Sequence, residues 1–196
     1  MDRRFFAVIL VILAILGGVF WFSKPKHSAP GQTNGVAQVS NHTDGAGKKG
    51  VTLLQYGDLQ CPVCGTYYPI LKQVRQKYGD DITFQYRNFP LTQIHPKAFA
   101  AHRAAEAAGL QGKFFEMHDL LYERQKTWTV TDNTAIFEQY AKELGLNVET
   151  FRKDFASELV NDTINADLKA GQALGVNGTP TFFINGQKIV LLFSLK

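Results

Sequence analysis

The stretch GDLQCPVCG, residues 57–65, holds both cysteines of the 196-residue chain, Cys61 and Cys64. The apolar run VTLLQY, residues 51–56, precedes it and predicts a short buried strand. After it, large apolar and aromatic residues recur every three or four positions up to Tyr78, which predicts a helix beginning at the cysteines. A Cys-x-x-Cys pair at a strand-to-helix junction is typical of a thioredoxin-like redox site.

The pattern after this junction predicts the rest of an α/β domain. ITFQYRNF, residues 82–89, alternates like a second strand, and TPTFFING, residues 179–186, predicts a strand that runs into an Asn-Gly turn. KIVLLFSL, residues 188–195, predicts its partner strand. Helical patterns fill the chain between. We therefore expect an α/β thioredoxin-like fold, with a large all-helical insertion at about residues 95–175 between the second strand and the strand that begins at Pro180.

The first fifty residues predict a membrane anchor and a linker. FFAVILVILAILGGVFWF, residues 5–22, has no charge and is flanked by basic residues, which predicts a transmembrane anchor with a short basic tail over residues 1–22. A cleaved signal peptide is the alternative, but its apolar core is usually shorter and is followed by small residues. Residues 23–50, rich in Gly, Ser, Asn and Pro, predict a flexible linker. Either interpretation places the domain predicted at residues 51–196 outside the cytoplasm, and an uncleaved anchor ties it to the cell membrane.

The charge distribution argues against nucleic acid as a partner. The formal charge of +4 arises entirely in residues 1–50, which carry six Lys and Arg and two acidic residues. Residues 51–196 hold 15 basic and 15 acidic side chains. A nucleic-acid-binding domain should show a basic surface, so we expect no nucleic-acid binding.

The start of a helix would give the two cysteines different roles. Unpaired backbone N–H groups there favour negative charge, and should lower the pKa of Cys61 from about 8.5 to roughly 3.5–7.5. Cys61 is then the nucleophile, and Cys64, one turn further along, resolves the mixed disulfide. Pro62 suits an early helical position because its missing N–H has no partner there.

Two other interpretations of the cysteine pair are weaker. A structural disulfide across two residues closes a very short loop and would stabilise little. A zinc site needs two more ligands, and His95, His102 and His118 lack a compact spacing. We expect His102 and His118 to be surface or packing residues and His27 and His42 to be solvated in the linker. No metal site is predicted.

Thr179-Pro180 lies directly before an apolar strand, where an ordinary central strand would avoid proline. A cis bond there would present the backbone N–H and C=O of Thr179 to an extended peptide. The alternative is a plain loop proline.

Together these segments resemble the DsbA-related family of bacterial thiol:disulfide oxidoreductases, especially its membrane-anchored BdbD-like branch. The matching stretches, which span most of residues 51–186, are YGDLQCPVC, YRNFPL, HPKAFAAHRAAEAAGLQGKFFEMHDLLYE, FEQYAKELGLNVETF and ALGVNGTPTFFING.

The resemblance implies transfer of disulfides to reduced, unfolded exported proteins. It implies an exposed Cys61, a buried Cys64 and a cis Pro180 facing them, with Thr179, Pro62 and Val63 contacting substrate or tuning reactivity. It implies no cofactor other than the redox-active disulfide Cys61–Cys64. A quinone-linked membrane protein would reoxidise this pair.

Three features depart from the family pattern. Val63 stands where many members have histidine, which removes one donor to the Cys61 thiolate. Gln55 stands where many have a buried acid, so the proton acceptor for Cys64 is unassigned. Relatives continue into a C-terminal helix that should cover one sheet face, whereas this sequence stops after IVLLFSLK, residues 189–196. An uncovered apolar strand favours association, so we expect a truncated end, a frameshifted end or burial against a second chain.

Several functions remain open from the sequence. A disulfide oxidase is the leading hypothesis. A reductase or isomerase of the same fold fits the same motif and would differ in reduction potential. A non-enzymatic peptide-binding module and a peroxidase are the remaining alternatives.

Overall fold

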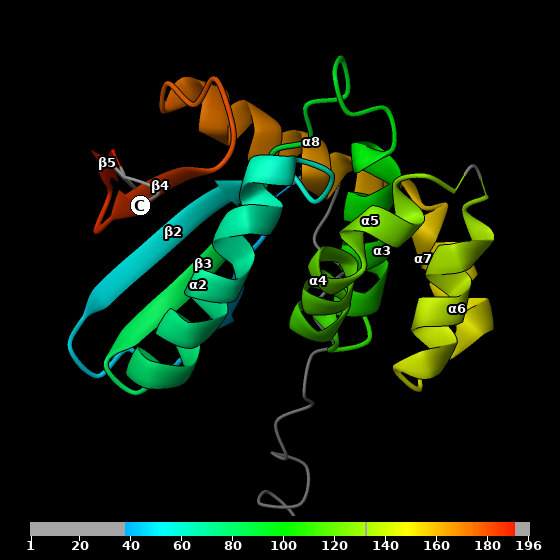
Figure 1. Ribbon diagram of the computed structural model, residues 1–196, viewed down its shortest axis with the longest axis horizontal. Coiled ribbons are helices and arrows are strands. Elements are labelled where there is room, and N and C mark those ends of the chain that lie inside the picture. Colours follow the sequence, from blue (N-terminus) through cyan, green and yellow to red (C-terminus); the bar gives the residue numbers. More distant parts are fainter. Residues whose placement is uncertain (1–37, 132, 191–196) are drawn as a thin grey trace, which may run out of the picture. The chain divides into compact units, whose positions relative to one another are not determined.

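The computed structural model describes residues 38–131 and 133–190 of the chain. Its centre is a five-stranded mixed sheet in the order β1-β3-β2-β4-β5 (Figure 1). The strands are β1 (His42–Asp44), β2 (Val51–Gly57), β3 (Ile82–Asn88), β4 (Thr181–Ile184) and β5 (Gln187–Ile189). Only the β2–β3 pair is parallel, and the helix α2 (Pro62–Tyr78) connects these two strands.

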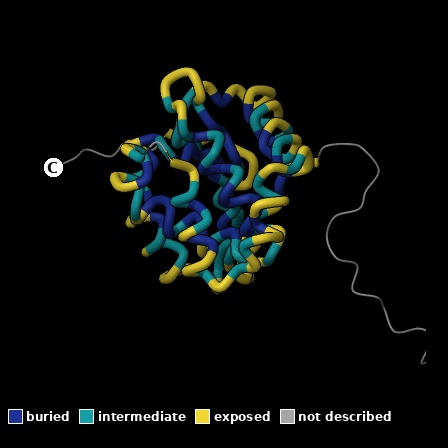
Figure 2. Tube along the Cα trace, turned by 90° about the vertical axis from the view of Figure 1, so that its right-hand side faces the viewer, coloured by how far each residue is buried: buried dark blue, intermediate teal, exposed yellow. Residues whose placement is uncertain are grey.

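Apolar residues alternate between the two faces of the sheet, as the two-residue period of a strand requires. On β4, Phe182 joins the main core with Cys64 and Tyr68 of α2, whereas Phe183 packs on the opposite face with Tyr56. The helix α8 (Glu158–Ala173) contributes to this second face (Figure 1). Strand β4 therefore has buried side chains on both faces of the sheet, whereas the edge strands β1 and β5 have no buried residue. Figure 2 shows the buried chain running through the interior.

The helices after β3 form the predicted insertion, which lies beside the sheet in Figure 1. Before α8 they are α3 (Ala98–Gly109), α4 (Phe114–Glu123), α5 (Gln125–Trp128), α6 (Ala135–Glu143) and α7 (Val148–Phe155). Small side chains let α3 pack closely, since six of its alanines are buried. The predicted thioredoxin-like fold with a helical insertion is confirmed.

The predicted boundary between linker and domain at residue 50 is wrong. Residues 42–44 form β1, which pairs with β3 through His42 opposite Tyr86. The backbone N–H and hydroxyl of Ser40 both donate to Asp167 of α8, at 2.8 and 2.6 Å. The composition misled because polar and ionic contacts, not apolar ones, tie this segment to the domain.

His42 is likewise not a solvated linker residue. Its ring stacks on Phe114 with centroids 3.4 Å apart, and its Nε2 lies 2.8 Å from Glu106 Oε1. His102 and His118 are buried packing residues, as expected.

The predicted anchor and the end of the last strand lie outside the described residues. Within residues 38–131 and 133–190, no helix is long and apolar enough to span a bilayer. The anchor over residues 1–22 therefore stays a prediction. Strand β5 ends at Ile189, and residues 191–196 of the predicted strand are not described.

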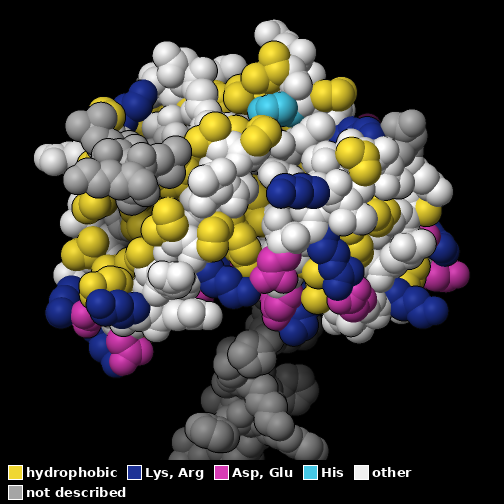
Figure 3. Space-filling view, in the orientation of Figure 1, with side chains coloured by type: hydrophobic (Ala, Val, Ile, Leu, Met, Phe, Trp, Pro, Cys, Tyr) yellow, Lys and Arg dark blue, Asp and Glu magenta, His cyan; other side chains and the backbone are white. Residues whose placement is uncertain are grey.

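Charges of both signs lie together along one edge of the face in Figure 3. The exposed ion pairs of the domain include Lys48–Asp80 at 2.8 Å and Lys49–Asp81 at 2.7 Å. Such exposed pairs contribute little to stability.

Candidate redox site

Cys61 caps the start of α2. Strand β2 ends at Gly57, and residues 58–60 carry the chain to Cys61, which has extended backbone angles of φ −64° and ψ 121°. Its carbonyl oxygen accepts from Gly65 N at 3.0 Å and so opens the helix. The N–H groups of Val63 and Cys64 have no helical carbonyl to bond, because they lie in the first turn. They face the Cys61 sulfur instead.

These donors lower the pKa of Cys61 from its ordinary 9.0 to about 5. The largest contribution is a hydrogen bond with the Cys64 side chain, and the N–H groups of Cys64 and Val63 and the Thr179 side chain add to it against the opposing effect of burial. The sequence argument placed the cause in the start of the helix, whereas the structure gives the partner cysteine first place. Cys61 is a thiolate at neutral pH.

Cys64 is in the opposite state. It has no solvent exposure, and this burial raises the pKa of its thiol well above the ordinary value, with the nearby Cys61 adding to the effect. Both cysteines are free thiols in this structure. A pair with one stabilised thiolate and one buried, protonated thiol has the asymmetry that disulfide exchange requires.

The exposed Cys61 implied by the family resemblance is not observed. Cys61 retains 5% exposure, because Thr179 covers it from the other side of the site. The neighbouring Pro62 and Val63 are exposed, Val63 by 52%. A substrate would therefore meet these two residues on its way to the sulfur.

The predicted cis bond between Thr179 and Pro180 is present. Cys61 Sγ lies 3.5 Å from the carbonyl oxygen of Thr179, to which it can donate only when it is protonated. The structure thus brings Cys61, Cys64, Thr179 and Pro180 together from segments more than 110 residues apart. Their roles in a reaction stay predictions.

Sequence analysis missed the anchors of the loop at residues 58–61. Every residue of this loop is hydrogen-bonded to the chain between β3 and the end of α5. The contacts are Asp58 Oδ2 with Leu91 N and His95 Nδ1 (both 2.8 Å), Leu59 N with His102 Nε2 (3.3 Å), Gln60 Oε1 with Lys97 N (2.7 Å), and Gln125 Nε2 with the carbonyls of Leu59 (2.8 Å) and Cys61 (3.0 Å). The position of Asp58 directly after β2 could have signalled one of them; the others depend on tertiary packing.

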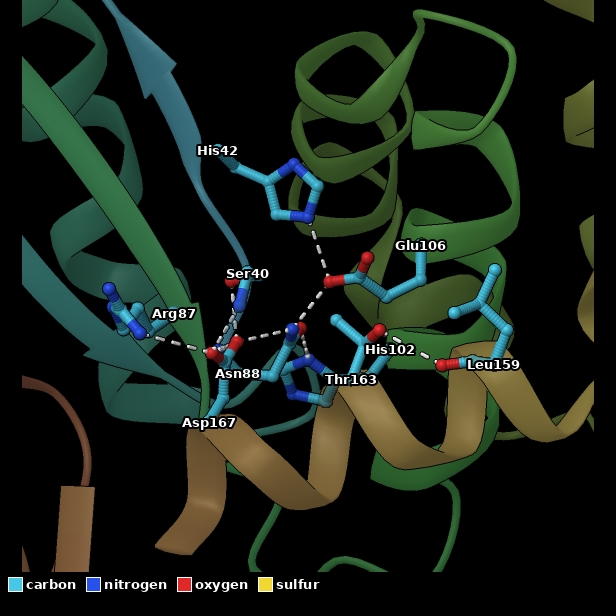
Figure 4. Close-up of polar contacts among 9 residues, drawn as sticks. All are labelled: Ser40, His42, Arg87, Asn88, His102, Glu106, Leu159, Thr163 and Asp167. Carbon is cyan, nitrogen blue, oxygen red and sulfur yellow. Dashed lines mark hydrogen bonds and ion pairs between the residues drawn. The ribbon is translucent and has the colours of Figure 1, made fainter. Parts of the chain in front are cut away.

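A buried polar network lies behind this loop (Figure 4). Its centre is Asn88, whose amide nitrogen donates to Glu106 Oε1 at 2.5 Å and to Asp167 Oδ2 at 2.8 Å. Asn88 Oδ1 lies 2.6 Å from His102 Nδ1, and Nε2 of the same ring faces the N–H of Leu59. Asn88 Oδ1 can only accept a hydrogen bond, and the Leu59 N–H can only donate one. Nδ1 of His102 therefore donates and its Nε2 accepts.

The pKa values in this network follow from burial. Burial lowers the pKa of His102 to about 4, so the ring is neutral at physiological pH, as its acceptor role requires. Burial raises the pKa of Asp167 above its ordinary value, although Ser40 and Asn88 donate to its carboxylate. The network supports the loop at residues 58–61, called the redox loop below, through His102.

Gln55 occupies a buried position on β2, with 1% exposure. Neither of its amide atoms has a hydrogen-bond partner among the described residues. An amide cannot accept a proton at neutral pH, so the structure agrees with the sequence in giving Cys64 no acid at this position.

The described part of the chain contains no cluster of three or more His, Cys, Asp or Glu side chains that could hold a metal ion. The zinc interpretation of the cysteines therefore gains no support from the geometry.

In a fold built on a mixed sheet, a Cys-x-x-Cys pair at the start of a helix and beside a cis-proline defines a dithiol site of the thioredoxin fold. The family model described as Thioredoxin matches residues 38–192, and the chain belongs to this family.

Solved structures of DsbA-like thiol-disulfide oxidoreductases have the same fold as this chain. A thioredoxin-like oxidoreductase from Silicibacter pomeroyi is 25% identical, with a TM-score of 0.63 over 76% of this chain and 82% of that one. BdbD from Bacillus subtilis is 22% identical, with a TM-score of 0.64 over 80% and 90%. MdbA from Corynebacterium diphtheriae, a thiol-disulfide oxidoreductase, is 20% identical, with a TM-score of 0.65 over 84% and 93%.

Curated relatives carry a similar segment inside a longer protein. Na(+)/H(+) antiporter NhaA 1 of Mycobacterium sp. (strain KMS) is 34% identical over 86% of this chain and 27% of its own length. The protein of the same name from Salinispora arenicola is 38% identical over 76% of this chain and 22% of its own. The chain thus spans about a quarter of these relatives.

Proposed function

We propose that this chain is a thiol:disulfide oxidoreductase, tethered to the membrane on its extracytoplasmic side, that introduces disulfides into reduced, unfolded exported proteins through Cys61 and Cys64. The observation that carries the proposal is the opposite pKa shift of the two thiols, down to about 5 for Cys61 and well upward for Cys64.

The reaction starts from the oxidised pair. A substrate thiolate attacks the Cys61 sulfur, the Cys61–Cys64 bond breaks, and Cys64 leaves with the electron pair. Because its pKa is raised, Cys64 takes up from solvent a proton equivalent to the one that the substrate thiol lost. A second substrate thiolate then attacks the substrate sulfur of the mixed disulfide and expels Cys61. The substrate is oxidised to a disulfide, and the pair is reduced to a Cys61 thiolate and a Cys64 thiol, while the second proton lost by the substrate goes to solvent.

The low pKa of Cys61 favours the oxidising direction. A stabilised thiolate is a good leaving group, and it makes the reduced pair the stable one, so the disulfide is readily given up. No cofactor besides the cysteine pair takes part. Thr179 and Pro180 would hold the substrate as an extended segment beside Cys61.

A reductase or isomerase is the second candidate, since the same geometry serves both directions. The discriminating quantity is the reduction potential of the pair, near −120 mV for an oxidant and near −270 mV for a reductant on the scale of known proteins, an order-of-magnitude guide. A non-enzymatic peptide-binding module would bind unfolded chains equally well after both cysteines are changed to alanine.

The predicted anchor and the antiporter relatives support the location. The relatives named as Na(+)/H(+) antiporters carry a similar segment within their own chains, which supports a position of this domain at a membrane. The pair would be reoxidised by a quinone-linked membrane protein, as the family resemblance implies.

The test uses the full chain in detergent micelles. We expect the oxidised protein to speed formation of native disulfides in reduced, unfolded ribonuclease, and Cys61→Ser to abolish this activity. When mixed with ribonuclease that still contains its disulfides, Cys64→Ser should instead accumulate a mixed disulfide, because the Cys61 thiolate attacks a substrate disulfide, expels one substrate thiolate and has no second cysteine to release it. Alkylation of Cys61 should rise with pH with a midpoint near 5. Full activity in Cys61→Ser, or a midpoint near 9, would overturn the proposal.

A further inference from the structure

The side chain of Gln125 holds the backbone of the redox loop from the helical insertion. Gln125 opens α5, and its single amide nitrogen donates one hydrogen to the Leu59 carbonyl at 2.8 Å and the other to the Cys61 carbonyl at 3.0 Å. Both N–H donors of the amide are therefore bonded to the backbone of Leu59, which precedes the Cys-x-x-Cys motif, and of Cys61, which begins it. Among the described residues, Gln125 is the one whose side chain forms a hydrogen bond with the backbone of Cys61.

Gly65 gives Gln125 the room to reach this loop. A Cβ added at Gly65 would lie 2.5 Å from Gln125 Oε1 and 3.1 Å from its Cδ. Real carbon atoms do not approach so closely, so any other residue at position 65 would displace the amide. Gly65 lies in the first turns of α2, where glycine is otherwise unfavourable to a helix. A glycine in this position has a packing reason, and the reason is Gln125.

The same peptide segment is held from its other side. Leu59 donates its N–H to His102 Nε2, while its carbonyl accepts from Gln125. With both ends of this residue bonded, the extended angles of Cys61 and the direction of its sulfur onto the N–H groups of Val63 and Cys64 have little freedom. A thiolate is stabilised by donors only while these stay aimed at it.

We propose that Gln125 is a positioning residue that sets the reactivity of Cys61 through the loop backbone, and that Gly65 is present to admit it. The proposal deepens the proposed function, on which it rests. It assigns to the helical insertion a direct part in tuning the redox pair, at a position outside the motif.

The physical consequence has a definite sign. Without the amide, the Leu59 carbonyl loses its hydrogen-bond donor from α5, and among the described residues the Cys61 carbonyl keeps the N–H of Gly65. The start of α2 then fluctuates more, the sulfur meets its donors less often, and the thiolate is less stable. The pKa of Cys61 should rise, and the equilibrium with glutathione should move toward the disulfide.

The test is a double-mutant cycle on the full chain with Gln125→Ala, Gly65→Ala and both together. Gln125→Ala should raise the pKa of Cys61 by roughly one unit, the loss expected for weakened hydrogen bonds to a charged group. Gly65→Ala should produce a similar shift by pushing the amide away. Because both changes remove the same contact, the double variant should shift the pKa no further than either alone.

Two further variants guard against a trivial result. Gln125→Glu keeps the shape but removes both donors, and should act at least as strongly as alanine. Gln111→Ala is the matched control, since this glutamine of the insertion also makes two hydrogen bonds, at 3.2 and 2.9 Å, but to the backbone of Asn147 away from the loop. It should leave the pKa of Cys61 and the glutathione equilibrium unchanged.

The coupling between the changes at Gln125 and Gly65 is also measured by urea unfolding, which does not depend on exchange activity. In the Gln125→Ala background, Gly65→Ala should raise the urea midpoint, because alanine favours the helix. In the wild type this gain should be absent. If the wild-type protein is inactive in disulfide exchange but shows this coupling, the proposed function is wrong and the positioning role of Gln125 stands. Additive effects of the two changes, or an unchanged Cys61 pKa in folded Gln125→Ala and Gln125→Glu, would overturn the inference.

Discussion

Two places in this molecule bury an ionisable group among hydrogen-bond donors, with opposite results. At the start of α2, the pKa of Cys61 falls to about 5. In the network behind the loop, four donor contacts from Ser40 and Asn88 converge on Asp167, yet its pKa rises. The number of donors does not decide the direction.

The difference lies in burial and in neighbouring charge. Cys61 keeps 5% exposure and faces a neutral thiol, whereas Asp167 has none and lies near Glu106, which shares the Asn88 amide. Complete desolvation of the Asp167 carboxylate costs more than these neutral donors and Arg87, whose Nη1 lies 3.4 Å from Oδ1, restore. One site therefore holds a reactive charge at the edge of solvent, and the other holds the loop and the N-terminal segment in place.

The largest effect should come from removing the buried carboxylate. Asp167→Ala leaves the donors of Ser40 and Asn88 unpaired, and should lower the free energy of unfolding by roughly 3–5 kcal/mol. Asp162→Ala, an exposed aspartate on the same helix, should change it by less than about 0.5 kcal/mol. Equal urea midpoints for the two variants would refute a structural role for the network.

The second effect is a pH dependence carried by His102. The folded protein keeps this ring neutral down to about pH 4, whereas the unfolded chain protonates it near 6.5. Between these values the unfolded state binds more protons, so stability falls as pH falls, on the order of 3 kcal/mol in total. The raised pKa of Asp167 acts with the opposite sign as the pH falls toward the ordinary 3.8.

His102→Gln removes the titrating group. Urea unfolding at a series of pH values should show a smaller loss of stability between pH 6.5 and 4 in this variant than in the wild type. Parallel profiles would show that His102 does not titrate differently in the two states.

The third effect tests the largest contribution to the Cys61 thiolate. Cys64→Ala removes the side-chain donor, and should raise the pKa of Cys61 by roughly one unit, the value of one hydrogen bond to a charged sulfur. Cys64→Ser keeps a donor in place and should shift it less. The ultraviolet absorbance of the thiolate measures both. Identical shifts would assign the low pKa to the helix start alone.

The smallest effect should come from restoring the family donor at the exposed position 63. Val63→His places an imidazole near the Cys61 thiolate, where its N–H, neutral or protonated, can stabilise the negative charge. The glutathione equilibrium should shift toward the dithiol by about threefold. Val63→Leu is the control and should leave it unchanged. A shift toward the disulfide would contradict the donor explanation.

Much of the fold could be predicted because its signals are local. Strands β2 and β3, the start of α2 at the cysteines and the helical insertion all follow from runs and spacings within short windows. The cis Thr179–Pro180 bond was predictable from a proline before an apolar strand and from the family resemblance. The failures have a common origin: Ser40 meets Asp167 across 127 residues, and no local window contains both.

By itself, the sequence determined the class of fold and predicts a redox pair in which Cys61 attacks, because the start of a helix favours negative charge wherever it occurs. Only the tertiary structure decided how far that preference is realised. The partner thiol, the amide of Gln125 and the buried ring of His102 reach the loop from distant segments, and the strength of an electrostatic interaction depends on distances and desolvation that exist only after the chain has packed.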